Sequence, residues 1–161
     1  MRLTTKGRYA VTAMLDLAFH CQTKPVTLTD IASRQTISLS YLEQLFAKLR
    51  KSDIVVGVRG PGGGYKLSRD VSEISVADVI AAVDETIDST KCGGKGDCQE
   101  GEACLTHELW LGLSEHIRSY LKDISLGDLL VKESVSRVAN RQDLKNGFVS
   151  TTIPLQEKMT A

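Results

Sequence analysis

The first seventy residues switch between helical and strand-like hydrophobic periodicity. Apolar residues recur at helical spacing over residues 6–21, over a short stretch after Pro25, and over residues 38–52. The third segment, SLSYLEQLFAKLRKS, is the most regular, and its predicted buried stripe is Leu39, Leu42, Leu45, Phe46 and Leu49. A β-branched run at 54–58 and an alternating run at 65–68 flank the loop RGPGGG, which predicts a β-hairpin.

Polar residues mark where the predicted helices begin. Thr27 and Ser38 precede the second and third helices as candidate N-caps, and Asp30 follows Thr27 at the spacing of a capping box. Ser75 and Asp78 repeat this pattern at the start of a helix within residues 74–84. That helix is expected to bury Val76, Val79, Ile80 and Val83.

A short helix, a turn, a capped helix and a hairpin follow one another in the order of a winged helix-turn-helix, predicted over residues 1–84. The polar face of the third helix could read base edges or could simply be solvated. Arg59 precedes the glycines of the hairpin loop, where it could enter a narrow minor groove. A phosphate-binding P-loop is excluded because the glycines lead into a strand and no Gly-Lys-Ser/Thr follows.

A second part of the pattern predicts a long helix from Cys104. Its apolar positions fall at spacings of three and four: Leu105, Leu109, Leu113, Ile117, Tyr120, Leu121 and Ile124. Pairing with the same helix of a second copy would bury this stripe, and packing back on its own domain is the alternative. We expect a dimerisation region at 104–130, with a brief helix after Ser125, and a loose tail at 131–161.

Charge is unevenly distributed along the 161 residues. Net charge is zero, but residues 1–70 hold 11 basic and 5 acidic residues, whereas the remainder holds 9 and 15. The basic half favours a polyanionic partner such as nucleic acid. No apolar run approaches the roughly 20 residues of a membrane helix, and no signal peptide is recognisable. We therefore expect a cytoplasmic protein without a membrane partner, whose thiols stay reduced.

The segment KCGGKGDCQEGEACLTH concentrates metal-ligating residues in a predicted loop at 85–107. Cys92, Cys98, Cys104 and His107 would form a complete four-ligand set. The wide gaps of five residues favour an iron–sulfur cluster, with structural zinc or a thiol redox site left open. A histidine ligand should make the bound group easier to lose, because a proton competes for the same nitrogen near neutral pH.

Other reactive residues predict less. An enzyme using Cys104 and His107 as nucleophile and base is disfavoured, because no orienting group or oxyanion loop accompanies them. Cys21 is interpreted as a buried structural cysteine, and no role is assigned to His20 or His116.

Together, MRLTTKGRYAVTAMLDLA, ISLSYLEQLFAKLRK, VRGPGGGY and the four-ligand loop closely resemble the IscR family, the iron–sulfur cluster-sensing winged-helix transcription regulators of bacteria. The resemblance runs from Met1 to about Leu130. It implies a mainly α fold with a small hairpin wing, a homodimer on near-palindromic promoter DNA, and control of cluster-biogenesis genes by repression or activation. It also implies a [2Fe–2S] cluster on Cys92, Cys98, Cys104 and His107, received from the cluster assembly machinery.

For the DNA surface, the resemblance implies major-groove contacts from Ser40, Glu43 and Gln44 and a minor-groove role for Arg59. The full predicted set is Ser40, Tyr41, Glu43, Gln44, Lys48, Arg59, Gly60 and Gly62. Glu43 should act as a veto, because a carboxylate near phosphates is repelled unless a cytosine amino group meets it. The rival to this account is a zinc-stabilised DNA-binding dimer that senses nothing.

Overall fold

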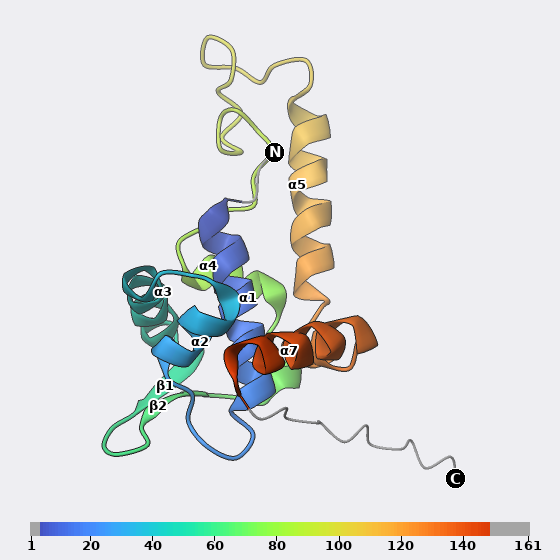
Figure 1. Ribbon diagram of the computed structural model, residues 1–161. Helices are drawn as coiled ribbons and strands as arrows, with labels where there is room; N and C mark the ends of the chain where they lie inside the picture. The colour runs from blue at the N-terminus through green and yellow to red at the C-terminus, as the bar shows by residue number, and fades with distance from the viewer. Residues whose placement is uncertain (1–3, 149–161) are drawn as a thin grey trace.

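The computed structural model describes residues 4–148, and these are mainly helical with one two-stranded hairpin (Figure 1). The elements follow in the order α1 (Thr5–His20), α2 (Leu28–Gln35), α3 (Leu39–Lys51), β1 (Val55–Val58), β2 (Gly64–Leu67), the 3-10 turn η1 (Val71–Glu73), α4 (Val76–Ala82), α5 (His107–Lys122), α6 (Leu126–Leu130) and α7 (Glu133–Asn146). This confirms the predicted fold class, a helix-turn-helix with a hairpin wing.

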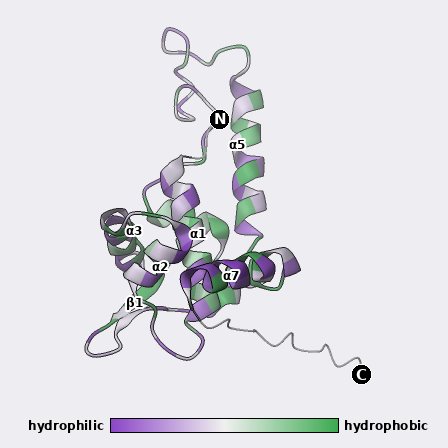
Figure 2. Ribbon diagram, in the orientation of Figure 1, coloured by the Kyte–Doolittle hydropathy of each residue, from purple (hydrophilic) through white to green (hydrophobic). Residues whose placement is uncertain are grey.

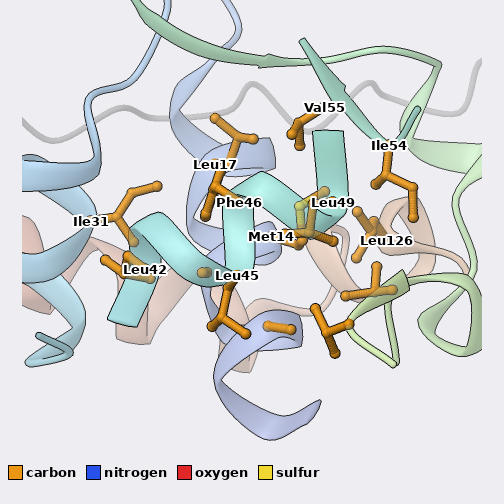
Figure 3. Close-up of a cluster of buried hydrophobic side chains, with 14 of the residues drawn as sticks. Met14, Leu17, Ile31, Leu42, Leu45, Phe46, Leu49, Ile54, Val55 and Leu126 are labelled. Atoms are coloured by element: carbon orange, nitrogen blue, oxygen red, sulfur yellow. The ribbon is translucent and has the colours of Figure 1, made fainter. Parts of the chain in front are cut away.

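The core forms where α3 packs on α1 (Figure 3). Four of the five predicted stripe residues on α3 are buried, and they meet Met14 and Leu17 of α1. Leu39 is the exception, because it lies at the first position of α3 and is 41% exposed. Burying this many large aliphatic side chains supplies the main driving force for folding of this part.

Capping follows the predicted pattern in two of three cases. The Thr27 hydroxyl accepts the Asp30 N–H at 3.1 Å, which is one half of the predicted capping box, whereas Ser75 and Asp78 form both halves. Ser38 precedes α3 with extended backbone but its side chain makes no cap hydrogen bond. As predicted, α4 buries Val76, Val79, Ile80 and Val83.

The hairpin is antiparallel, with Val55 opposite Leu67 and Val58 opposite Gly64. A short bridge between Val26 and Tyr65 joins it to the turn before α2. This bridge fixes the hairpin beside the helix-turn-helix.

Helix α5 stands beyond the rest of the molecule as an arm (Figure 1). Its apolar stripe divides into two halves. Ile117 and Leu121 pack, with Ile124, against the α4 residues Val76 and Ile80. Leu109, Trp110 and Leu113 are exposed instead, and apolar bands follow the arm in Figure 2. Packing onto its own domain therefore accounts for Ile117, Leu121 and Ile124, whereas Tyr120 in the same half of the stripe is exposed.

The predicted loose tail is wrong for the described part beyond residue 131. Residues Glu133–Asn146 form helix α7, which packs on α2 and α6, whereas residues 149–161 lie outside the described range. The helix has a weak apolar pattern, with Ala139 packed against the cluster of Ala18, Phe19 and Leu130, and it also contributes buried polar groups. Asp143 on α7 is fully buried and lies 3.1 Å from His20 of α1.

His20 belongs to a wider buried network, although the sequence suggested no role for it. Arg34 of α2 forms a two-pronged ion pair with Asp16, with its closest approach 2.6 Å. Gln35 donates to Asp16 at 2.6 Å and also exchanges hydrogen bonds with Gln142 of α7. Helices α1, α2 and α7 are thus held by one set of polar contacts.

Across residues 4–148, every helix is too short or too polar to span a lipid bilayer.

Candidate metal centre and nucleic-acid interface

The loop between α4 and α5 brings two cysteines and a histidine together. The sulfur of Cys92 lies 3.5 Å and that of Cys98 3.7 Å from Nδ1 of His107. The three ligand atoms lie within 4.8 Å of one another. Residues fifteen and nine positions apart therefore converge on one point, at the far end of the arm from α7 (Figure 1).

Loop geometry and helix packing make this convergence possible. Gly93, Gly94 and Gly96 adopt positive φ angles, a backbone conformation that side chains disfavour, so the chain can turn tightly between Cys92 and Cys98. His107 is buried as the first residue of α5, which fixes its ring toward the loop.

Cys104 occupies a different place from the one predicted. Helix α5 begins at His107, not at Cys104, so these two residues do not share a helix face. The Cys104 N–H instead donates to the sulfur of Cys98 at 3.0 Å, and its own sulfur lies 3.8 Å from the Thr106 hydroxyl. The described structure thus brings together three of the four predicted ligands and leaves the fourth at the edge.

All four predicted ligands line one hollow of about 360 Å³. Its walls also include Thr90, Thr106 and Trp110, which the sequence interpretation did not assign to the site. Trp110 donates its indole N–H to Thr106 at 3.1 Å, which closes one side. Since one water occupies only about 30 Å³ in the liquid, this hollow has room for more than a single atom.

The thiols have unequal acidities. Burial raises the pKa of the Cys92 thiol, but hydrogen bonds from the Gly96 N–H and the Thr90 hydroxyl outweigh this and lower the pKa to about 7. A hydrogen bond from Cys98 lowers the pKa of Cys104. The hydrogen bond from the Cys104 N–H lowers the pKa of Cys98. The Cys104 side chain, burial and the Cys92 side chain raise it by more, so the pKa of Cys98 lies above its usual value.

These donors fit a metal ion or an iron–sulfur cluster. Thiolate sulfur and imidazole nitrogen are the ligands that zinc and iron–sulfur centres take, and thiolate is the form that ligates. All four cysteines are free of disulfides, so none of the sulfurs is already committed.

The candidate DNA surface lies on α3 and the hairpin, on the other side of the molecule from α5 (Figure 1). Ser40, Glu43 and Gln44 are exposed in the first turns of α3. This is the part of a recognition helix that meets base edges in other helix-turn-helix proteins.

Two predicted residues of α3 have protein partners. The ring of Tyr41 is half-buried and meets Tyr9 edge-on, with 5.9 Å between the ring centres. The ammonium of Lys48 lies 2.8 Å from Oδ2 of Asp84, which lies just before the predicted cluster loop at 85–107. The sequence contained no local signal for either pairing, because the partners are 32 and 36 positions away.

The hairpin loop presents Arg59 at its base. Arg59 is exposed, and Gly60 and Gly62 adopt the left-handed conformation that glycine favours. Gly63 has no room for a side chain, since a Cβ there would lie 2.4 Å from the Val58 carbonyl oxygen. The loop therefore turns tightly, and its glycines place no bulky side chains beside Arg59.

Comparisons with known proteins agree with this arrangement. A model of the Rrf2 family, described as an iron-dependent transcriptional regulator, matches residues 3–132. The HTH-type transcriptional regulator IscR of Vibrio cholerae serotype O1 is 62% identical over 144 residues, which cover 89% of this chain and 83% of that protein. IscR of Vibrio atlanticus is 59% identical over 152 residues, covering 92% and 88%.

Solved structures give the same picture. The IscR of T. potens has a TM-score of 0.69 at 38% identity, covering 83% of this chain and 90% of that one. CymR, the global cysteine regulator of B. subtilis, has a TM-score of 0.70 at 32% identity, covering 81% and 96%. These relatives are named as regulators rather than enzymes, in agreement with the sequence interpretation.

Proposed function

The chain belongs to the Rrf2 family of transcriptional regulators, and we propose that it is an iron–sulfur cluster-responsive regulator of promoter DNA. In this proposal a homodimer binds near-palindromic sites, and cluster occupancy changes which sites it selects. The observation that carries the proposal is the convergence of two thiols on Nδ1 of His107 in a chain that also holds a winged helix-turn-helix.

The group proposed at this site is a [2Fe–2S] cluster held by Cys92, Cys98, Cys104 and His107. Three ligand atoms already converge, and Cys104 lines the same hollow. When bound, the cluster would supply a redox-active and removable centre. One histidine among the ligands favours removal, since protons compete with the metal for the imidazole nitrogen near neutral pH.

The proposed DNA contacts combine base reading with backbone positioning. Ser40, Glu43 and Gln44 would meet base edges in the major groove, with Tyr41 and Lys48 at its margin. On the hairpin, Arg59 would enter the minor groove, and Gly60 and Gly62, which follow it, would leave room for the approach. Support comes from the exposure of Ser40, Glu43 and Gln44 on α3 and from the tight, glycine-rich loop beside Arg59.

Dimerisation is proposed through the exposed half of the α5 stripe. Leu109 is 63% exposed and Leu113 39% exposed, so the arm has an apolar face that its own chain does not cover. A two-fold pair of such arms would place the two recognition helices at half-sites roughly 34 Å apart.

The proposed targets are cluster-biogenesis genes, repressed or activated according to the site. We also place the protein in the cytoplasm, with its cluster supplied by the assembly machinery. The relatives named IscR support a role in transcription regulation. A reducing compartment suits the four free thiols of this chain.

One observation favours a second candidate, a zinc-stabilised DNA-binding dimer. Only three ligand atoms lie within 4.8 Å of one another, a spacing that a single ion also fits. Anaerobic purification followed by visible spectroscopy and by iron and acid-labile sulfide analysis separates the two. Visible absorption with about two irons and two sulfides per chain is expected from a [2Fe–2S] cluster, as its formula requires. Colourless protein with one zinc per chain would overturn the cluster proposal.

A further inference from the structure

Lys48 of the recognition helix is neutralised by a residue outside that helix. Its ammonium lies 2.8 Å from Oδ2 of Asp84, and the two side chains are 41% and 76% exposed. The carboxylate sits among other cations, since Lys6 donates to the Asp84 backbone carbonyl at 3.0 Å and Lys51 lies close enough to lower its pKa. The hydrogen bond from Lys48 contributes most to the lowered pKa of Asp84.

The position of Lys48 on α3 suits a phosphate contact. Lys48 follows Gln44 by one helical turn, so the two residues share a face. Where the first turns of such a helix meet base edges, the next turn approaches the sugar–phosphate wall of the groove. In the free protein, however, Lys48 already forms an ion pair with the carboxylate of Asp84.

We propose that Asp84 competes with a DNA phosphate for Lys48 and thereby limits the affinity of the recognition helix for any duplex. This inference rests on the proposed function, because it requires α3 to dock on DNA. An exposed ion pair is weak, so a phosphate can displace the carboxylate. The displaced Asp84 then lies near the duplex, where it must recruit a cation in place of Lys48.

The backbone at Asp84 explains why an acidic residue can be held there. Asp84 follows α4 with a φ of 54°, in the left-handed region that aspartate and asparagine tolerate better than most residues. The next residue anchors the turn, since the Glu85 carboxylate accepts the Thr4 N–H at 2.6 Å. Asparagine can therefore replace Asp84 with its backbone unchanged, and only the charge is removed.

The test measures binding of cluster-free, full-length protein to duplex DNA across a series of salt concentrations. Asp84→Asn should bind several-fold more tightly than the wild type, by a similar factor on every sequence. Its plot of log affinity against log salt should be steeper by about 0.9, the contribution of one phosphate contact. Glu133→Gln removes an equal charge from an exposed position on α7 and is the matched control.

A double-mutant cycle locates the effect. In a Lys48→Gln background, Asp84→Asn should no longer raise affinity, because the lysine for which Asp84 and the phosphate compete is gone. A gain that persists without Lys48, or an Asp84→Asn protein with the wild-type affinity and slope, would overturn the inference. If the wild type itself shows no salt-dependent DNA binding, the proposed function fails instead, so the two failures are distinguishable.

Discussion

Nε2 of His20 lies 3.1 Å from both carboxylate oxygens of Asp143, and thereby joins α1 to α7 across 123 positions of the chain. The other ring nitrogen, Nδ1, faces the Asp16 carbonyl oxygen at 2.7 Å. Both nitrogens thus face acceptors, and each acceptor needs an N–H. The geometry favours the doubly protonated, charged ring.

Removing the carboxylate of Asp143 should destabilise the fold. Asp143→Ala leaves the buried N–H of His20 without its acceptor, which typically costs about 1–3 kcal/mol. Urea unfolding followed by circular dichroism measures the loss. Glu133→Ala, which breaks an exposed pair with Arg137 on the same helix, should change little. If both variants lost the same free energy of unfolding, the buried contact would contribute no more to stability than the exposed pair.

The His20 contacts should also make stability depend on pH. Burial lowers the pKa of His20, but the hydrogen bonds to Asp16 raise it more, so the folded-state pKa lies above the usual 6.5. Protonation therefore stabilises the folded state. This contribution is fully present below pH 6.5 and is lost as the pH rises through the folded-state pKa.

Wild type and His20→Gln should accordingly differ most in unfolding free energy below pH 6.5, and the difference should shrink on the alkaline side. Urea titrations at a series of pH values measure this difference. A difference in unfolding free energy between the two proteins that stayed constant or grew with rising pH would contradict the charged-ring interpretation. Asp16 should change stability only at acidic pH. Burial raises its pKa, but the hydrogen bond and charge of Arg34 lower it more, so its stabilising contribution is present above pH 3.8 and is lost as the pH falls below that value.

The histidine ligand, His107, should set how long a cluster is retained. His107→Cys replaces an imidazole by a thiolate. A thiolate donates more charge to the metal and differs from imidazole in how strongly protons compete with the metal for it. We expect its visible absorption to decay several-fold more slowly under a chelator than that of the wild type. Cys92→Ala should contain little iron, whereas Cys21→Ala, outside the loop, should retain the wild-type content. Faster decay in His107→Cys would argue against histidine as the labile ligand.

Glu43 should restrict which sites the cluster-free protein accepts. Its carboxylate is exposed on α3, where a duplex lacking a suitable cytosine amino group would repel it. Glu43→Ala should therefore let cluster-free protein bind sequences that the wild type rejects, by a factor of roughly 10 or more for one such contact. Gel-shift titrations on matched duplexes give the ratio, and an unchanged site preference would refute the veto.

Local patterns predicted much of the fold because they act over a few residues. The α3 stripe, the Ser75–Asp78 capping box and the hairpin around the glycines are all set by neighbours along the chain. The sequence also indicated the candidate ligand residues, of which Cys92, Cys98 and His107 converge in the structure.

Long-range polar pairing could not be predicted in the same way. Asp143 is one acidic residue in a mostly polar helix, and nothing near it in sequence indicates that it meets His20. The pairing of Lys48 with Asp84 was missed for the same reason. Helix α5 begins later than its leucine spacing suggested, because the Cys104 N–H bonds to the Cys98 sulfur and not within a helix.

The most direct measurement compares anaerobic, cluster-loaded protein with the cluster-free form on one panel of promoter duplexes at fixed salt, by fluorescence anisotropy. Our account predicts that at least one class of duplex is bound at least tenfold more tightly by the loaded form, and that Cys92→Ala behaves like the cluster-free protein throughout. Identical affinities of both forms for every duplex would contradict it.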